Sequence, residues 1–171
     1  MPNLLEGRSA LILGVANRWS LAYAIAQAFA REGAKLFLTF QGERQRETVE
    51  ELAEELDGAH ALNCDVTVPE DLESLTEVLA KCGSPLDAVV HSIAFANRED
   101  LSRPFIETSR SGYLLAQEVS AYSLISVARA TAPLMSRGGS LTTLTYLGAS
   151  RVVSNYNVMG AAKAALEASV R

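Results

Sequence analysis

The sequence has few of the features that mark secreted, membrane or nucleic-acid-binding proteins. Its 171 residues include only two cysteines, Cys64 and Cys82, which lack metal-cluster spacing, so we expect structural thiols and no metal ion. The net charge is −5 and no run of basic residues occurs, which argues against a nucleic-acid partner. No signal-peptide pattern and no bilayer-length apolar stretch is found, so we expect a cytoplasmic protein without membrane insertion.

Short apolar runs alternate with amphipathic segments along the chain. The apolar runs are typical of buried parallel strands and cover residues 9–14, 35–40, 59–64, 86–91 and 140–146. The amphipathic segments predict helices from 21 to a stop at Gly33, over 43–56, 69–81 and 113–136, and from 157 onward, with a loop or short helix in 94–112. Regular alternation implies parallel pairing and right-handed crossovers. We therefore expect an α/β fold, a Rossmann-like doubly wound parallel sheet with helices on both faces.

The last predicted helix has no stop signal. Neither glycine nor proline closes the segment 161–171, whereas a doubly wound sheet normally has a sixth strand. Two explanations remain open: the chain is a fragment, or a partner covers the open edge of the sheet. We favour a fold truncated after the helix that follows the fifth strand.

A glycine turn joins the first predicted strand to the first helix. Such a turn directs backbone N–H groups and a helix N-terminus toward a pyrophosphate. Gly14 allows a close approach of the backbone, Ser20 can cap the helix or bind a phosphate, and Ala22 permits tight helix–strand packing. Only one of the three usual glycines is present, so an ordinary strand-to-helix corner is an equally good interpretation.

The second strand ends at Gln41, where many dinucleotide-binding proteins have an acid that binds the adenosine ribose. A neutral amide can bond a ribose hydroxyl but brings no charge for a 2′-phosphate. Arg44 and Arg46 are near and could bind a 2′-phosphate, so NADP remains an alternative cofactor. The alternative is that Gln41 is only a solvated loop residue.

Two further strand ends carry residues suited to a nucleotide. Asp65 can accept a hydrogen bond from an adenine amine while Val66 packs on the ring, although loop capping is an equal alternative for Asp65. Ser92 and Ile93 begin a stretch that continues into Ala94, and its small residues let a ligand lie against the backbone.

A tyrosine and a lysine stand seven residues apart near the end of the sequence. Tyr156 and Lys163 would share one helix face, and a nearby ammonium is expected to lower the pKa of the phenol. Such a phenol can stabilise an oxyanion or donate a proton. Tyr146, at the end of the fifth predicted strand, would complete a substrate pocket. The alternatives are an interfacial tyrosine, a solvated lysine and a core aromatic.

Taken together, these motifs resemble a known family. Gly14-x5-Ser20-x-Ala22 followed by Tyr156-x6-Lys163 is similar to the divergent short-chain dehydrogenase/reductase pattern, and most similar to the bacterial enoyl-acyl-carrier-protein reductases of fatty-acid synthesis. The likeness covers the whole chain and is carried by residues 38–42, 64–66, 91–96, 145–148 and 155–164. It implies one dinucleotide-binding domain over residues 1–171.

The resemblance also implies a mechanism. NADH delivers a hydride to the β-carbon of a trans-2-enoyl thioester, and Tyr156 hydrogen-bonds the enolate oxygen that results. Lys163 holds the nicotinamide ribose and supplies positive potential, and Tyr146 is the second tyrosine of the site. By the same likeness the cofactor contacts are Gly14, Ser20, Leu21, Gln41, Asp65, Val66 and Ile93, and Ala96 lies beside the acyl chain.

The family further implies NADH in preference to NADPH, which accompanies Gln41, an acyl carrier protein as partner, and a homotetramer. Its members continue beyond the lysine helix with a strand, a proline-containing nicotinamide-binding stretch and a mobile substrate loop. These parts are absent from the 171 residues, so we do not expect full activity from this chain by itself.

Two rival functions remain. Short-chain reductases that act on ketones place a tyrosine four residues before the lysine, but here that position is Met159, which has no proton to donate. The second rival is a non-catalytic dinucleotide-binding or oligomerisation domain. The matched Tyr156 and Lys163 argue against it, because a sensor has no evident need of that pair.

Overall fold

The computed structural model describes residues 3–83 and 85–171. Their contacts divide them into two compact units. The first comprises the described residues up to Ser92 together with Ala128–Thr143, and the second comprises Ile93–Val127 and Leu144–Arg171. This division does not test the expectation of one domain over residues 1–171, which stays a prediction.

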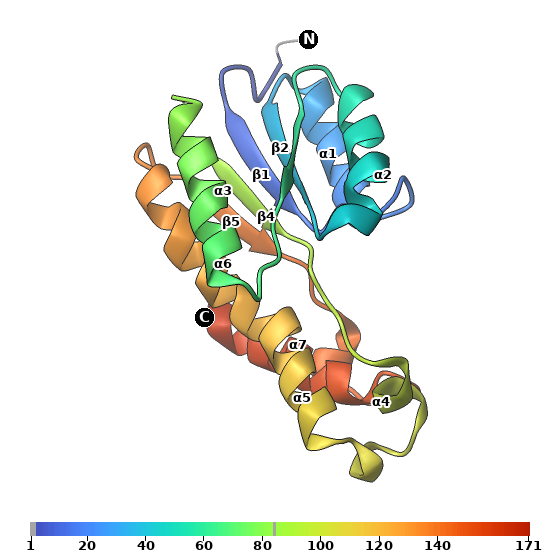
Figure 1. Cartoon of the computed structure of the whole chain (residues 1–171). Helices are drawn as coiled ribbons and strands as arrows, with labels where there is room; N and C mark the ends of the chain where they lie inside the picture. Colours follow the sequence, from blue (N-terminus) through green and yellow to red (C-terminus); the bar gives the residue numbers. More distant parts are fainter. Residues whose placement is uncertain (1–2, 84) are drawn as a thin grey trace. The chain divides into compact units, whose positions relative to one another are not determined.

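The first unit is built on a five-stranded parallel sheet in the order β3-β2-β1-β4-β5 (Figure 1). Every neighbouring pair of strands is parallel. The strands are β1 (Ser9–Leu13), β2 (Lys35–Phe40), β3 (His60–Asn63), β4 (Ala88–His91) and β5 (Ser140–Thr143). The strand order turns back beside β1, which is the arrangement of a doubly wound sheet. The predicted Rossmann-like class is confirmed.

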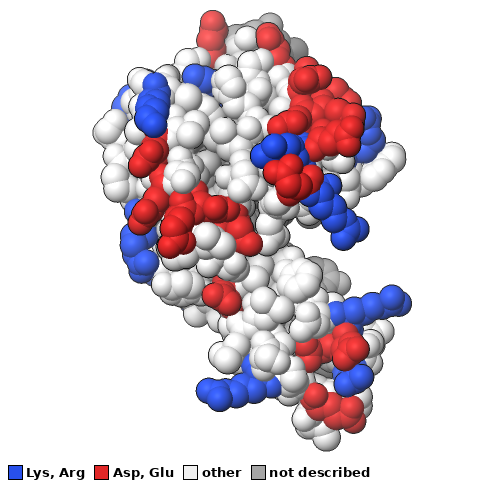
Figure 2. Space-filling view, in the orientation of Figure 1, with Lys and Arg blue, Asp and Glu red and all other residues white. Residues whose placement is uncertain are grey.

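Helices cover both faces of this sheet. The helices α1 (Leu21–Arg31) and α2 (Glu43–Glu54) lie on one face and α3 (Pro69–Lys81) on the other (Figure 1). Acidic side chains gather over α2 and α3 (Figure 2), in agreement with the net charge of −5. The short 3-10 helix η3 (Ala132–Leu134) follows α6 (Ser123–Thr131), and the boundary between the two units falls inside α6.

The core of the first unit lies between the sheet and the helices α1 and α2. Successive side chains of a strand point to opposite faces, so alternate residues of β1 and β2 reach this core. The buried strand residues in it are Ala10, Ile12, Leu36, Leu38, Phe40 and Val90, and they pack on Ala22, Tyr23, Ala26, Val49 and Leu52. Burying one large aliphatic side chain stabilises a fold by about 1.5–3 kcal/mol.

Local sequence signals set several helix ends as predicted. Ser20 caps α1, because its hydroxyl oxygen accepts a hydrogen bond from the backbone of Tyr23. Gly33 follows the end of α1 with a φ of +83°, a left-handed conformation that favours glycine. Pro69 occupies the first turn of α3, where its missing N–H is not needed.

The second unit is helical. It contains α4 (Arg98–Ser102), η1 (Phe105–Glu107), α5 (Arg110–Gln117), the π-helical turn η2 (Glu118–Tyr122), the first part of α6, η4 (Leu147–Ala149) and α7 (Asn157–Val170). None of the helices in the described part of the chain combines the length and the apolar character that a membrane span requires.

Two predicted elements differ from the structure. The single helix expected over 113–136 begins earlier, because the Ser109 hydroxyl accepts a hydrogen bond from the backbone of Gly112 and so caps the helix. The turn η2 and the 3-10 helix η3 interrupt it, and Pro133 lies in η3. The fifth strand ends at Thr143 rather than at 146. Tyr146 therefore precedes η4 instead of ending the strand, and the Leu144 carbonyl accepts a side-chain hydrogen bond. The strand expected over 35–40 matches β2, and the ends of the other three strands agree with expectation within two residues.

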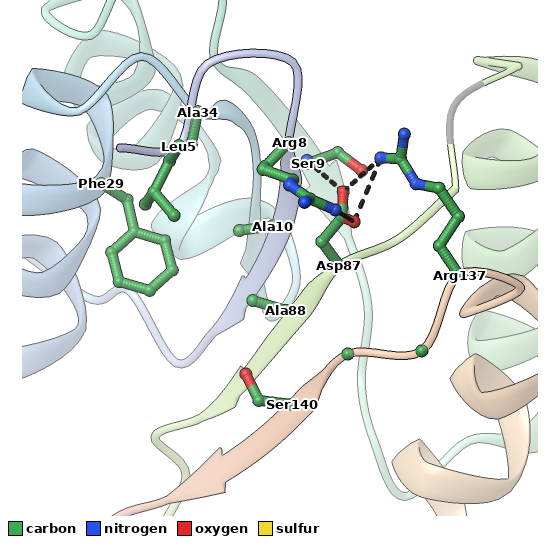
Figure 3. Close-up of a pocket in the computed structure, with 12 residues that line it drawn as sticks. Leu5, Arg8, Ser9, Ala10, Phe29, Ala34, Asp87, Ala88, Arg137 and Ser140 are labelled. Atoms are coloured by element: carbon green, nitrogen blue, oxygen red, sulfur yellow. Dashed lines mark hydrogen bonds and ion pairs between the residues drawn. The ribbon is translucent and has the colours of Figure 1, made fainter. Parts of the chain in front are cut away.

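A pocket of about 350 Å³ lies at the amino ends of β1, β4 and β5, and none of the predicted site residues lines it (Figure 3). At its rim Asp87 accepts hydrogen bonds from Arg8 at 2.9 Å and from Arg137 at 2.9 Å. The backbone N–H of Ser9 donates to the same carboxylate at 3.0 Å. These contacts join the beginnings of β1 and β4 to the turn before β5.

The sheet core leads to a stability prediction. Leu38 is fully buried in β2. The variant L38A should lower the free energy of unfolding by about 2–5 kcal/mol, because the smaller side chain leaves a cavity in the core. L4A is the matched control, since Leu4 is 78% exposed, and it should change stability by less than about 0.5 kcal/mol. Urea unfolding of both variants measures the difference. Equal costs would show that the sheet does not pack on α1 and α2 as described.

Candidate functional site

In the first unit the predicted cofactor residues follow the carboxyl ends of parallel strands. Gly14 follows β1 with a φ of +94°, which favours glycine. Ser20 donates to the Asn17 carbonyl at 2.7 Å and accepts from Tyr23 at 3.3 Å, so its capping role is present. Leu21, the first residue of α1, is 68% exposed. The turn therefore presents its backbone and an open helix N-terminus at this edge.

Gln41 and Asp65 are brought together at the same edge. The Gln41 amide donates to the Asp65 carboxylate at 2.7 Å, which ties the end of β2 to the end of β3. Gln41 is therefore more than a solvated loop residue. The other Asp65 oxygen accepts from the backbone and the hydroxyl of Thr67 at 2.9 and 2.7 Å, so Asp65 also caps its loop. Partial burial favours a higher pKa for Asp65, but the bonds from Thr67 and Gln41 outweigh it and lower the pKa.

Two residues that the sequence did not single out support this pair. Asp71, in the first turn of α3, accepts from the backbone of Asp65 at 2.8 Å and from the Asn63 amide at 3.2 Å. Asn63 in turn accepts from the backbone of Gly42 at 3.0 Å. An acid in the first turn of a helix was the available signal for Asp71.

The remaining predicted residues of this unit also lie at the strand ends. Val66 is half-buried beside Asp65. The backbone of Ser92 donates to the Leu13 carbonyl at 3.1 Å, which continues the pairing of β1 with β4. Cys64, just before Asp65, is buried. Burial raises the pKa of its thiol to about 12, and the negative charges of the two nearby aspartates add smaller increases. Its thiol is therefore protonated at neutral pH.

The arginines that follow β2 differ in their surroundings. Arg46 pairs with Glu43 at 3.0 Å, and its guanidinium lies 5.8 Å from the centre of the Phe40 ring. Arg44 is exposed. Arg46 is thus partly neutralised within α2, whereas the position of Arg44 on the surface leaves it accessible to an anion.

In the second unit the two predicted tyrosines meet. The rings of Tyr146 and Tyr156 are 4.9 Å apart, edge to face, at an interplanar angle of 61°. Tyr146 is 50% exposed and Tyr156 is half-buried. Tyr156 is the residue just before α7, so it is not itself part of the helix. The rings share an apolar contact while the more exposed Tyr146 faces solvent.

Two glycines allow this arrangement. A methyl group on Gly148 would collide with the ring of Tyr156, and one on Gly160 would lie 2.9 Å from the Gly148 carbonyl oxygen. Both positions lie where α7 packs against η4. Tyr156, Gly148 and Gly160 also line a hollow of about 520 Å³. The ring of Tyr156 is therefore held by a surface that has room only for glycine.

Lys163 is buried on α7, with 5% of its surface exposed, and its ammonium donates to the Leu144 carbonyl at 2.7 Å. The alternative of a solvated lysine is wrong. Burial lowers the pKa of Lys163. The expected lowering of the Tyr156 pKa is also wrong: burial raises it, and the neighbouring Tyr146 adds to the rise. The reason is that the ring is shielded from water and the lysine bonds a backbone carbonyl instead.

The other predicted residues of this unit are close to Tyr156. Ala96 and Tyr156 pack against the same buried cluster, which is formed by Ala116, Val158, Met159 and Ala162. Ile93 is half-buried at the beginning of the unit. Met159, the position at which ketone reductases carry tyrosine, is 6% exposed and belongs to this apolar cluster.

The predicted site residues thus form two groups, one in each unit. Strand ends hold the residues expected to bind a dinucleotide in the first unit, and α7 with its preceding loop holds the tyrosines and the lysine in the second. The residues themselves supply hydrogen-bond acceptors for hydroxyl or amine groups, a protonated phenol and a buried amine.

Comparisons with known proteins show which family and which relatives this chain is similar to. A family model described as "Enoyl-(Acyl carrier protein) reductase" matches residues 14–171. The enoyl-[acyl-carrier-protein] reductase [NADH] FabI of Bacillus cereus is 50% identical over 170 residues, which are 98% of this chain and 66% of the relative. The enoyl-[acyl-carrier-protein] reductase [NADPH] FabI of Staphylococcus aureus is 47% identical over 169 residues, again 98% of this chain and 66% of the relative.

A solved structure agrees with these sequences. The B. cereus enzyme in complex with NADP+ and indole naphthyridinone superposes with a TM-score of 0.96 at 50% identity, over 99% of this chain and 66% of that chain. The chain thus spans just under two thirds of the length of these relatives.

The close contact at Gly148 leads to a prediction. Gly148→Ala should lower the free energy of unfolding by about 1–3 kcal/mol, because the added methyl group forces the ring of Tyr156 out of its place. The adjacent Ser150→Ala is the control, since Ser150 is exposed, and it should change stability by less than about 0.5 kcal/mol. Urea unfolding and the near-ultraviolet circular dichroism of the tyrosines report both effects. An unchanged spectrum in Gly148→Ala would mean that the ring does not rest on residue 148.

Proposed function

The chain belongs to the enoyl-(acyl carrier protein) reductase family, and we propose that its protein reduces the trans-2 double bond of an enoyl-acyl-carrier-protein thioester with NADH. This reaction is the last reductive step of the fatty-acid elongation cycle. The observation that carries the proposal is the Tyr146–Tyr156 pair on the unit that also holds the buried Lys163.

The residues at the strand ends fit a dinucleotide. Gly14 lets the chain turn without a side chain where a pyrophosphate would approach, and the first turn of α1 is favourable for an anion. Gln41 and Asp65 supply the acceptors that ribose hydroxyl and adenine amine groups require. We assign cofactor binding to these residues together with Ser20, Leu21, Val66, Ser92 and Ile93. When bound, NADH supplies the hydride.

The tyrosine acts as a hydrogen-bond donor in this proposal. Burial raises the pKa of Tyr156 and so reinforces the neutral phenol, which can donate to the thioester oxygen as negative charge develops there. Tyr146 packs on the ring of Tyr156 and restricts the positions that this ring can take. Ala96, which packs against the same cluster as Tyr156, is assigned to the acyl chain.

Lys163 has the second role. An ammonium group has three N–H donors, and one of them is used by the Leu144 carbonyl. The others are available for the hydroxyls of the nicotinamide ribose, which we assign to Lys163. Its positive charge, when present, also favours negative charge on a neighbouring oxygen.

The residues after β2 support NADH over NADPH. Gln41 is neutral, Asp65 beside it carries a lowered pKa and hence a negative charge, and Arg46 is paired with Glu43. A 2′-phosphate would meet the Asp65 carboxylate here, with the exposed Arg44 as its main attraction. The B. cereus relative is named for NADH and the S. aureus relative for NADPH, so both choices occur among similar proteins.

We base the assignments of partners and location on the family and the composition. We assign an acyl carrier protein as the partner that brings the substrate, a homotetramer as the working assembly, and the cytoplasm as the location. The family's name supports the first assignment.

The choice of substrate tests the reaction. The protein expressed from its natural gene should reduce a crotonyl thioester with NADH and leave an acetoacetyl thioester nearly unchanged, because the apolar Met159 has no proton to donate to a ketone. Oxidation of NADH, followed by absorbance, measures both rates. Faster turnover of the ketone would overturn the proposed reaction in favour of a ketone reductase.

The phenol has a direct test. Tyr156→Phe should lower kcat for the crotonyl thioester by about 100-fold to 1,000-fold, the usual cost of losing one donor to a developing oxyanion. Tyr113→Phe is the control, since Tyr113 is a partly exposed residue of α5 outside the site, and it should retain normal turnover. Undiminished turnover in Tyr156→Phe would remove the basis of the mechanism.

A further inference from the structure

The residue after the catalytic tyrosine has an unusual backbone and a side chain with no free donor. Asn157 is the first residue of α7, and its φ is +34°. Asn155, on the other side of Tyr156, has a φ of +59°. Residues other than glycine adopt such conformations rarely, and asparagine tolerates them best. Tyr156 thus stands between two residues with left-handed backbone conformations.

The amide of Asn157 binds the end of α4. Its nitrogen donates to the Leu101 carbonyl at 2.9 Å and to the Arg103 carbonyl at 2.7 Å. An amide nitrogen carries two protons, so both are used. Carbonyl groups at the end of a helix lack partners within the helix, and here a side chain from α7 supplies them. The chain from 101 to 103 is thereby joined to the residue that follows Tyr156.

The same segment of α4 reaches the cluster beneath the phenol. Leu101 packs against the buried residues on which Tyr156 and Ala96 also rest. The turn around Tyr156 is therefore held from three sides: by Gly148 against the ring, by Tyr146 at the ring edge, and by Asn157 through the backbone of α4. Of these contacts, only that of Asn157 acts on the turn by hydrogen bonds to another segment.

We propose that Asn157 is a positioning residue for the hydroxyl of Tyr156: by anchoring the start of α7 to the carbonyls of Leu101 and Arg103, its amide fixes the turn that aims the phenol. This inference rests on the proposed function, because it gives the tyrosine its catalytic part. Asn157 does not itself touch the reacting atoms. Displacements of about 1 Å in a catalytic group can reduce rates about 100-fold, so a loosened turn has a measurable effect.

Three variants separate positioning from simple stabilisation. Asn157→Gly keeps the left-handed backbone but removes the amide, and Asn157→Ser keeps one donor. Asn155→Gly is the matched control, since it also keeps a left-handed backbone and leaves the amide of Asn157 in place. The assay uses the protein expressed from its natural gene, with NADH and a crotonyl thioester, after circular dichroism has shown that each variant is folded.

We expect kcat to fall about tenfold or more in Asn157→Gly and by an intermediate factor in Asn157→Ser, while the KM for NADH stays within about twofold. Asn155→Gly should retain the normal kcat. The phenol of Tyr156, titrated by ultraviolet difference against Tyr156→Phe in the same background, should show a pKa closer to the usual 10.0 in Asn157→Gly, because the ring gains contact with water.

The outcomes are distinct. A folded Asn157→Gly with normal kcat and an unchanged phenol titration overturns the inference, and so does a loss of thermal stability with both readouts unchanged. Failure of both Asn157 variants to fold also overturns it, because Asn157 is then structural. Full turnover in Tyr156→Phe overturns the proposed function instead, while the phenol titration still reports whether Asn157 positions the ring.

Discussion

The close approach of α7 to the segment 147–149 is the constraint on which the candidate site depends. It exists because residues 148 and 160 are glycines, so the backbone of one segment and a side chain of the other occupy the space that two methyl groups would fill. The ring of Tyr156 is held there, and burial in that place raises its pKa. The packing of the Tyr156 ring therefore depends on the absence of a Cβ atom at residue 148, and the approach of α7 to residue 148 depends on its absence at residue 160.

The parallel sheet brings together short polar side chains from distant parts of the sequence. Because all five strands run the same way, the residues that follow them share one edge. The hydrogen bond between Gln41 and Asp65 joins two such loops, and Asn63 and Asp71 extend the network into α3. A surface of hydrogen-bonding groups thus arises from strand direction, with each loop contributing one or two groups.

Much of this architecture was predictable because its causes are local. Apolar runs gave the strands, and Ser20, Gly33 and Pro69 gave helix ends through capping and backbone conformation. Tyr156 and Lys163 could be singled out as candidate site residues from their spacing in the sequence. The direction of the Tyr156 pKa was not predictable, because it depends on burial by residues distant in the sequence. Nor was the break after α5, where the hydroxyl of Ser120 bonds the backbone of Phe95 and a π turn replaces the α-helix.

At the opposite edge of the sheet, Asp87 shows how one ionised carboxylate can make a strand junction depend on pH. Burial works against its ionised form, but the Ser9 backbone and the guanidiniums of Arg8 and Arg137 outweigh it, so its pKa lies below the usual value. A lowered pKa in the folded state contributes stability above the unfolded pKa, and the contribution disappears only as pH falls through the folded one. The ion pairs of Arg8 and Arg137 with Asp87 therefore hold the beginnings of β1 and β4 to the turn before β5 while that carboxylate is ionised, and they weaken as acid protonates it.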